Sequence, residues 1–309
     1  MRVAIVGGSG LVGRALSRSL LDDGVEVVVL SRAARKRRRV VDPRAAVVDW
    51  AVGDVVAMAT TLRGADSVVC LAGARVAPWS WTGRRKGTIA ASRVDAIRTV
   101  VGGIERLPAD RRPASLVVVS GIDAYPESGS DPEVASWTET SPRGTEFLAR
   151  VSQAVETEAG RAAPLGVRVT RLRMGHVLAR DADLVWYLAL PVRLFLGGRI
   201  GSGRQWLSWV HIDDAVALFR RAIGDREVGD VLNVVSPGAC RQIEFVQEMA
   251  RVLHRPAWFP APARLVRLVL GEQSVLLLGS RRVGPARALD LGYGFRYPTI
   301  ESALAQVLG

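Results

Sequence analysis

Three glycines near the amino terminus have the spacing of a turn that binds phosphate. Residues 7–13 read GGSGLVG, so Gly7, Gly10 and Gly13 recur at every third position directly after an apolar run. Gly7 permits a tight turn off a strand, Gly10 lets a pyrophosphate approach the backbone, and Gly13 lets a helix pack closely on a sheet. The helix start offers free N–H groups to phosphate oxygens. The pattern predicts a dinucleotide site contacted by Gly7, Ser9, Gly10, Leu11, Val12 and Gly13.

The end of the next apolar run, VEVVVLSR (25–32), indicates which dinucleotide fits. An acidic residue there would hold the ribose 2′-hydroxyl of NAD, but the chain has Ser31 and Arg32, with Arg35 close behind. A guanidinium with a hydroxyl suits a 2′-phosphate through charge-assisted hydrogen bonds. We therefore predict NADP rather than NAD as the cofactor. The competing interpretation is that Arg32 is only a surface residue of a basic loop.

The elements that must position these residues alternate along the chain. Apolar runs that predict strands lie at 3–8, 25–32, 45–50, 66–73, 115–121, 167–175 and 230–236. Segments with helical spacing lie at 11–24, 55–63, 84–106, 144–156, 212–223, 241–253, 262–278 and 299–308. Strands of nearly continuous Val, Ile and Leu that alternate with helices are typical of a parallel sheet covered on both faces. We therefore predict an α/β fold with a doubly wound parallel sheet.

Length and composition predict one large body with a smaller second part. The chain has 309 residues, near the upper limit for a single hydrophobic core. Apolar residues make up 49% of it, which excludes a disordered chain. We expect residues 1–174 to form the dinucleotide-binding domain and residues 175–309 a smaller α/β part that binds substrate.

Cysteine usage and hydropathy restrict the location of the protein. Cys70 and Cys240 are far apart, which excludes a disulfide framework and a cysteine-based metal site and fits a reducing compartment. No basic and apolar leader precedes the first predicted strand. The run 184–198 is interrupted by Pro191 and Arg193, so it predicts a buried helix and loop rather than a membrane span. We expect a cytoplasmic protein.

The formal charge of +12 invites a nucleic-acid interpretation, which the pattern of charges does not favour. Lys36 and Lys86 are the only lysines among 42 basic residues, and one run alone is dense, RAARKRRR (32–39). The motifs of helix-turn-helix, zinc-finger and RNP proteins are all missing from the sequence. We expect no nucleic-acid partner, and predict that the basic run is a solvated loop or a loop for one phosphate.

Motifs along the whole chain resemble one family. They include LAGA (71–74), Trp81-Thr82 with Ser92-Arg93, SG (120–121), LRMGHVLA (172–179), GGRIGSGRQWLSWVHIDDAV (197–216), NVVSP (233–237) and LGEQSVLLLGSRRVGPARALDLGYGFRYP (270–298). With the glycine turn they resemble the atypical extended short-chain dehydrogenases, usually labelled NAD-dependent epimerase/dehydratase or sugar-nucleotide epimerase. The C-terminal segment of that family, here 255–309, is a domain of unknown function. The resemblance implies a Rossmann-type fold with NADP, and no particular substrate.

The resemblance also implies further cofactor contacts. Those expected along the adenosine and pyrophosphate are Leu71, Ala72 and Gly73, and those beside the nicotinamide are Met174 and Val177. Asp49 and Trp50 are expected to border the adenine.

The proton relay of the resembled family is missing from this chain. In that family a Ser or Thr after the fifth strand orients the substrate oxygen, and a tyrosine with a lysine four residues later transfers the proton. The spacing matters because positions i and i+4 share one helix face. The tyrosines here are 125, 187, 293 and 297, none is followed by lysine at that spacing, and the helix over 144–156 has Phe147 and Val151 instead. The chemistry must therefore use other groups.

Ser120 and Tyr125 are the remaining candidates for catalysis. Ser120 ends the fifth predicted strand, and Tyr125 lies in the following loop. A tyrosine needs a nearby cation to act as a base at neutral pH, and the candidates are Arg143, Arg173 and His176. The competing interpretation of Tyr125 is a loop aromatic that packs on the surface. Asp123 and Glu127 are either a second acid/base pair or solvated carboxylates.

Aromatic and amide side chains suggest a substrate pocket. Gln205 and Trp206 follow a glycine-rich loop, and a planar ring with an amide suits a sugar or nucleotide. Trp79 and Trp81 are placed to close such a pocket from the other side. We predict substrate contacts from Trp81, Gln205 and Trp206.

His211, Asp213 and Asp214 follow directly and favour a structural interpretation. His211 precedes a predicted helix, and either carboxylate is placed to cap its first turn. The alternative is a metal site, which we do not predict because the other histidines, His176 and His254, lack supporting spacing.

Two functional hypotheses follow. The first is an NADP-dependent oxidoreductase or epimerase-like enzyme of the short-chain superfamily that acts on a small hydroxylated or carbonyl substrate. The second, suggested by Phe147 and Val151, is a non-catalytic NADP-binding sensor or regulator. The sequence predicts no oligomeric state.

Overall fold

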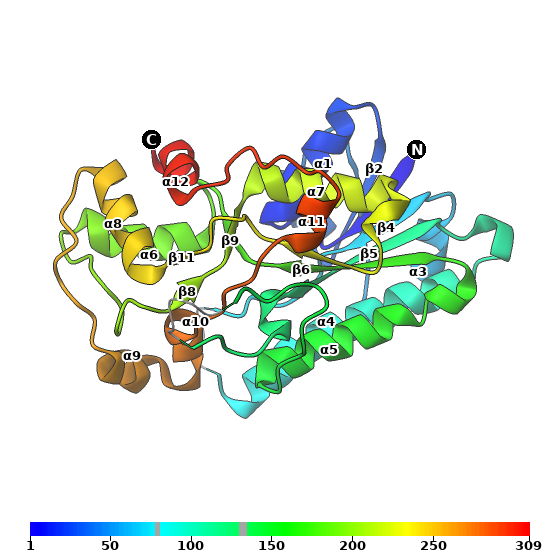
Figure 1. The fold of residues 1–309 in the computed structure, drawn as a ribbon. Helices are drawn as coiled ribbons and strands as arrows, with labels where there is room; N and C mark the ends of the chain where they lie inside the picture. Colours follow the sequence, from blue (N-terminus) through cyan, green and yellow to red (C-terminus); the bar gives the residue numbers. More distant parts are fainter. Residues whose placement is uncertain (78–80, 130–134) are drawn as a thin grey trace.

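A seven-stranded parallel sheet forms the centre of the molecule (Figure 1). The computed structural model describes residues 1–77, 81–129 and 135–309. Its strand order is β10-β6-β5-β4-β1-β2-β3, with every neighbouring pair parallel. The strands are β1 (Arg2–Val6), β2 (Glu26–Ser31), β3 (Ala46–Asp49), β4 (Ser67–Cys70), β5 (Ser115–Gly121), β6 (Arg168–Met174) and β10 (Val231–Val234). The predicted α/β class and doubly wound parallel sheet are confirmed.

Helices cover both faces of this sheet (Figure 1). One face carries α1 (Leu11–Asp22) and α7 (Ile212–Gly224), and the other carries α3 (Val55–Leu62), α4 (Gly83–Glu105) and α5 (Phe147–Gly160). Strand side chains alternate between the two layers, so Val3 and Ile5 join the cluster under α1 whereas Ala4 and Val6 join the cluster under α4. Both faces are buried, which explains why the strands are apolar at every position.

The strand order reverses between β1 and β4. The chain first runs from β1 outward to β3 and then returns to β4 on the other side of β1. The registers place Val6 beside both Leu30 and Cys70, so the carboxyl ends of β1, β2 and β4 lie level. Connections leave such a switch point toward opposite faces and open a crevice there, where open α/β sheets bind ligands.

A second cluster of elements lies beside the carboxyl ends of the strands. Three helices bury their apolar faces together there: α6 (Asp183–Arg193), α8 (Gln242–Leu253) and α12 (Ile300–Leu308). The short strands around them are β7 (His176–Leu178), β8 (Trp206–Leu207), β9 (Trp209–His211) and β11 (Cys240–Arg241). The predicted boundary at residue 174 does not divide the molecule cleanly, because β10 pairs with β6 and completes the main sheet.

Two helices differ from the sequence-based expectation. The helix expected over 262–278 is broken into α9 (Ala263–Leu270) and α10 (Val275–Leu278), because Gly271 adopts a positive φ of 56° and a 3-10 turn follows. The run 184–198 was expected to be buried, but Trp186 is 51% exposed. Among the described residues, no helix is long and apolar enough to cross a membrane.

His211 and Asp214 join the last segment of the chain to α7. His211 caps the helix, because its Nδ1 accepts the backbone N–H of Asp213 at 3.2 Å. Asp214 is buried and accepts three hydrogen bonds at 2.8–2.9 Å, from the Tyr293 hydroxyl and the backbone N–H groups of Arg296 and Tyr297. The prediction that an aspartate carboxylate caps α7 is thus wrong, because the His211 side chain is the cap. The Asp214 carboxylate instead binds the segment that leads from α11 (Ala286–Asp290) to α12.

Replacing Gly13 by alanine should destabilise the fold, whereas the same change at Gly87 should not. A Cβ on Gly13 would lie 2.5 Å from the Gly8 Cα, while a Cβ on Gly87 in α4 meets nothing within 4 Å. We expect Gly13→Ala to lower the free energy of unfolding by about 1–3 kcal/mol through overpacking. Gly87→Ala should raise it by about 0.5–1 kcal/mol through helix propensity. Chemical denaturation of both variants measures this, and equal effects would contradict the proposed close packing of α1.

Candidate functional site

The glycine turn forms one wall of a crevice at the switch point. Gly7 has a φ of 79°, and a Cβ there would lie 2.8 Å from the Ala72 backbone nitrogen. Gly10 is the N-cap of α1 and provides no side-chain cap, so the first N–H groups of the helix face the crevice without a partner from it. A Cβ on Gly10 would come no nearer than 3.6 Å, to the Gly7 carbonyl oxygen. The tight turn predicted at Gly7 and the close helix packing predicted at Gly13 are both present, and the approach of a pyrophosphate at Gly10 stays a prediction.

The crevice has a volume of about 770 Å³. Its lining includes ten of the predicted cofactor residues: Gly7, Ser9, Gly10, Leu11, Ser31, Arg32, Leu71, Ala72, Gly73 and Val177. Trp50 also lines it, as the resemblance implies, whereas the Asp49 carboxylate accepts the backbone N–H of Ala34 at 2.8 Å. Val12, Gly13 and Arg35 are outside this lining.

The end of β2 gives the crevice a positive side. The Ser31 and Ser9 hydroxyls lie 3.3 Å apart, and Arg32 is exposed beside them. Arg37, from the short helix α2 (Ala34–Arg37), lines the crevice where Arg35 was predicted to do so. The helical turn accounts for the exchange, since it directs the two side chains differently. Both acidic residues that line the crevice are ion-paired: Asp181 with Arg14, and Asp183 of α6 with Arg75.

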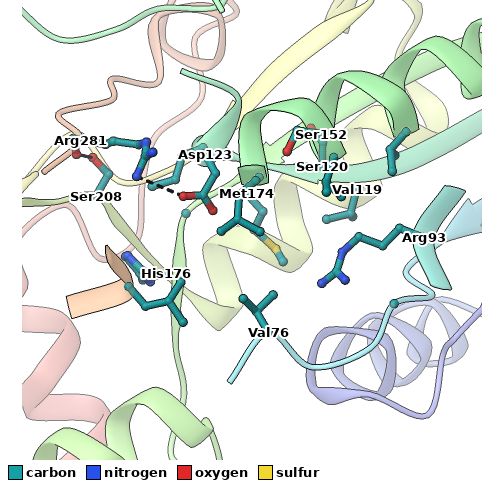
Figure 2. A pocket seen from close by; sticks show the side chains of 18 of the residues that line it. Val76, Arg93, Val119, Ser120, Asp123, Ser152, Met174, His176, Ser208 and Arg281 are labelled. Atoms are coloured by element: carbon teal, nitrogen blue, oxygen red, sulfur yellow. Dashed lines mark hydrogen bonds and ion pairs between the residues drawn. The ribbon is translucent and has the colours of Figure 1, made fainter. Parts of the chain in front are cut away.

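A second hollow, the inner cavity, adjoins the crevice and has a volume of about 380 Å³. Leu71, Ala72 and Gly73 line both hollows, so the two meet along the end of β4. Figure 2 shows two groups of polar side chains around it: His176, Asp123, Arg281 and Ser208 on one side, and Ser120, Ser152 and Arg93 on the other. Met174 lies between the groups, so it borders the inner cavity rather than the crevice.

Ser120 is held by a buried cluster of charges behind the inner cavity. Its hydroxyl donates to Glu156 Oε1 at 2.8 Å, and the same carboxylate accepts from Arg173 at 2.9 and 3.0 Å and from Arg143 at 2.7 Å. Burial alone would raise the pKa of Glu156, but the hydrogen bonds and charge of Arg173, with the help of Ser120 and Arg143, lower it below its usual value. Glu156 is thus a fixed negative charge that orients the Ser120 hydroxyl.

Phe147 and Val151 replace a catalytic pair with apolar packing. The Phe147 ring meets the Trp81 ring edge-on at a centroid distance of 5.4 Å, and the Lys86 ammonium lies 5.6 Å from the Phe147 centroid. Val151 lines the inner cavity, next to Ser152. The face of α5 that borders the cavity therefore provides a hydroxyl but no titratable group.

Tyr125 lies in the core, outside the lining of the inner cavity. Its side chain is fully buried, and its hydroxyl donates to Asn233 Oδ1 at 2.7 Å. Burial raises the pKa of Tyr125, and the neighbouring charge of Arg173 opposes this only in part. The predicted catalytic role of Tyr125 thus has no support from its position, because the hydroxyl is bonded to Asn233 and the residue is outside the lining of the inner cavity.

His176 and Asp123 are the titratable acid–base groups in the inner cavity lining. Asp123 pairs with Arg281 at 3.2 Å, and the Arg281 guanidinium also donates to the Tyr125 carbonyl oxygen at 3.1 Å. Burial lowers the pKa of His176 below its usual 6.5; the charge of Asp123 opposes this and that of Arg281 adds to it. His176 is therefore neutral at pH 7.

Of the three predicted substrate residues, Trp206 lines the inner cavity, and Gln205 and Trp81 do not. The guanidinium carbons of Arg241 and Arg282 lie 3.7 and 4.4 Å from the Trp206 ring centroid. The Gln205 amide instead donates to the carbonyl oxygens of Ile200 and Leu277 at 3.0 Å, a structural use. Trp81 packs on Phe147, and Trp79 lies outside the described residues. The described residues contain no cluster of His, Cys, Asp or Glu able to hold a metal ion.

Several charged residues of the site were not predicted. They are Arg14, Arg37, Arg75, Asp181 and Asp183 in the crevice, Arg93 and Arg281 in the inner cavity, and Glu156 behind it. Arg93 and Arg281 lie inside motifs that carry the family resemblance, which was the available signal. The sequence contains no such signal for Glu156, because its hydrogen-bond partners come from β5, β6 and the loop before α5.

The sheet, the glycine turn and the paired hollows define a dinucleotide-binding protein of the Rossmann class. The sequence profile of the NAD dependent epimerase/dehydratase family matches residues 3–235, and a domain of unknown function (DUF1731) matches residues 261–307. The chain belongs to this family, as its motifs suggested.

Relatives of similar length support this assignment. The chain is 32% identical to the chloroplastic epimerase family protein SDR39U1 homolog of Arabidopsis thaliana, covering 100% of this chain and 87% of that one. It is 31% identical to the epimerase family protein YfhF of Bacillus subtilis, covering 100% and 98%. The crystal structure of human SDR39U1 (isoform 2) with NADPH superposes with a TM-score of 0.86 at 30% identity, covering 100% and 99%.

Replacing Glu156 by glutamine should destabilise the protein at neutral pH. The change leaves the buried Arg173 guanidinium without its charged partner, which costs about 3–5 kcal/mol for a broken buried pair. Because the pKa of Glu156 is lowered in the folded state, the stabilisation exists above its usual value of 4.5 and is lost as the pH falls below it. The wild type should therefore lose stability on acidification more steeply than Glu156→Gln. Denaturation at several pH values measures this, with Glu146→Gln as an exposed control; parallel profiles would contradict it.

Proposed function

We propose that the chain is an NADPH-dependent oxidoreductase that acts on a small carbonyl or hydroxyl substrate bound in the inner cavity. The supporting observation is the continuity of the two hollows along Leu71–Gly73. A dinucleotide held at the glycine turn then extends its reactive end into a cavity that contains His176, Asp123 and Ser120. A sugar-nucleotide substrate is one member of this class.

The residues of the crevice fit the pyrophosphate of such a cofactor. The wall at Gly7 is backbone, and Gly13 packs α1 behind it; a Cβ at either position would collide with neighbouring backbone atoms. The helix start at Gly10 provides N–H groups without side-chain competition. Free N–H groups and a helix dipole are what a diphosphate needs.

The charge at the end of β2 favours NADPH over NADH. Arg32 and Arg37 line that end of the crevice, and Ser31 adds a hydroxyl. A carboxylate there would repel a 2′-phosphate, whereas two guanidinium groups attract it. The human relative crystallised with NADPH supports the same choice.

His176 is our candidate for proton exchange with the substrate oxygen. NADPH supplies a hydride, and the substrate carbonyl carbon accepts it while the carbonyl oxygen takes a proton, which gives an alcohol and NADP⁺. His176 lines the cavity, and because its pKa is lowered it is unprotonated at neutral pH and so available to accept a proton from a hydroxyl in the reverse direction. Ser120 accepts a hydrogen bond there, since its own proton is directed to Glu156.

The remaining parts of the prediction fit this proposal. Residues 175–309 provide Trp206, Ser208 and Arg281 to the inner cavity, so we assign substrate recognition to that part of the chain. Cys70 and Cys240 are both unpaired and buried, as expected for a reducing cytoplasm. We assign the protein no nucleic-acid partner.

The competing function is a non-catalytic NADPH sensor, favoured by the apolar Phe147 and Val151 on α5. An oxidoreductase oxidises NADPH in the presence of its substrate, whereas a sensor only binds it. A protein that binds NADPH but oxidises it with none of a broad panel of aldehydes, ketones and keto sugars would support the sensor.

Replacing Arg32 by alanine should weaken NADPH binding and leave NADH binding unchanged. The guanidinium is exposed, so we expect about a tenfold loss, the size of one charge-assisted hydrogen bond. Fluorescence titration with both cofactors measures it. Arg39→Ala, an exposed change in the same basic run that does not reach the crevice lining, is the control. Wild-type protein that binds NADH as tightly as NADPH would contradict the assignment.

Replacing His176 by glutamine should lower the rate of NADPH oxidation by about 100-fold, the usual contribution of a general acid. In the wild type, reduction should accelerate as the pH falls toward the lowered pKa of His176, below 6.5, because the protonated form donates. That rise should vanish in His176→Gln. Steady-state rates between about pH 5 and 8 measure this.

Tyr125→Phe is the matched control for His176→Gln. It removes the hydroxyl that bonds to Asn233 and interacts with Arg173, both outside the lining of the inner cavity, so it should reduce stability and leave the rate and its pH profile intact. If Tyr125→Phe abolishes turnover while His176→Gln retains it, the tyrosine is the proton donor and our assignment fails.

A further inference from the structure

Arg93 has a largely unused guanidinium at the junction of the two hollows. It projects from α4 into the inner cavity, as Figure 2 shows, and its one hydrogen bond within the described residues runs from Nη1 to the Ile89 carbonyl oxygen of its own helix at 3.0 Å. Within the same residues, no carboxylate lies at ion-pair distance from it. Other basic groups nearby are occupied: Arg281 pairs with Asp123, and Arg173 with Glu156.

The guanidinium lies directly against Gly73. A Cβ on Gly73 would be 3.1 Å from both the Arg93 Cγ and Cζ atoms. Gly73 is also one of the three residues that line both hollows. Arg93 is therefore at the point where a bound molecule passes from the crevice into the inner cavity.

The order of groups in a dinucleotide identifies what reaches this point. The pyrophosphate belongs at the glycine turn and the 2′-phosphate at Arg32. Beyond the pyrophosphate come the second ribose and then the nicotinamide. The second ribose, with two hydroxyl groups that accept hydrogen bonds, is thus the part that lies along Leu71–Gly73.

The α5 side of the inner cavity offers nothing comparable. Leu148, Val151 and Val155 line it with apolar side chains, and Ser152 adds an uncharged hydroxyl. Since α4 and α5 pack side by side, a long side chain from α4 reaches the same space. Figure 2 shows the Arg93 side chain directed toward Met174, which was expected beside the nicotinamide.

We propose that Arg93 binds the nicotinamide-side ribose of NADPH and so positions the nicotinamide over the inner cavity. The inference rests on the proposed function and assigns one residue to a defined part of the cofactor. Arg93 then acts by holding the cofactor, while proton transfer takes place across the cavity.

Three ligands that share the 2′-phosphoadenosine end test this proposal. They are 2′-phospho-ADP, which has both pyrophosphate phosphates but no second ribose, 2′-phospho-ADP-ribose, which adds that ribose, and NADPH. Arg93→Met keeps the length and apolar stem of the side chain and removes the charge. By calorimetric titration we expect it to weaken 2′-phospho-ADP-ribose and NADPH by about the same factor, on the order of tenfold. The affinity for 2′-phospho-ADP should stay within about twofold of the wild type.

Two controls complete the experiment. Arg98→Met changes an exposed arginine of the same helix and should alter none of the three affinities. Arg93→Lys restores a cation and should recover part of the loss. Thermal denaturation of each variant shows whether it is folded, which we expect because the single hydrogen bond of Arg93 is local to α4.

Each other pattern overturns the proposal. A loss for all three ligands places Arg93 on the pyrophosphate, and a loss for NADPH alone places it on the nicotinamide ring. No loss means that Arg93 faces the substrate. Wild-type protein that binds none of the three ligands would refute the proposed function itself, and is thus distinguishable from failure of this inference.

Discussion

The site depends on close backbone-to-backbone contacts made by glycines in the turn that follows β1. Gly13 brings α1 against Gly8, and Gly7 brings the turn against the backbone of Ala72 at the end of β4. These contacts set how far α1 lies from the two central strands. They therefore set the width of the crevice and the direction of the helix start. The position of the Leu71–Gly73 segment, which also lines the crevice, depends on the same contact between Gly7 and Ala72.

The charged side chains around the crevice differ from those around the inner cavity. Arg14, Arg32 and Arg37 surround the crevice, which suits phosphate groups. The negative charge of Glu156 is instead kept behind the inner cavity, where Arg173 neutralises it. Because the Ser120 hydroxyl donates its hydrogen bond to Glu156, its oxygen can only accept a hydrogen bond from the cavity side. Ser120 can thus orient a hydroxyl but is badly placed to polarise a carbonyl.

The sequence predicted the parts of the structure that follow from local patterns. The strand runs, the glycine turn and the basic end of β2 each carry their signal within a few residues, and the structure places them as expected. The missed or displaced features depend on residues distant in the chain. The Tyr125 hydroxyl finds Asn233 in β10, Gln205 supports the turn before Gly279, and β10 joins the main sheet. No local sequence pattern indicates such distant partners. From the sequence alone, Tyr125 and Gln205 were therefore interpreted as functional residues.

The absence of a tyrosine–lysine pair has a physical consequence beyond the loss of one motif. In such a pair one lysine both holds the cofactor and lowers the pKa of the proton donor, so binding and proton transfer depend on the same charge. Here the Arg93 guanidinium on α4 lines the inner cavity, while the titratable His176 follows β6 on the other side of that cavity (Figure 2). An arginine keeps its charge across the physiological pH range, whereas a histidine exchanges protons close to that range. In the proposed function, cofactor retention and proton transfer are therefore assigned to separate elements, and α5 can be apolar at Phe147 and Val151 while the chain keeps the fold of its family.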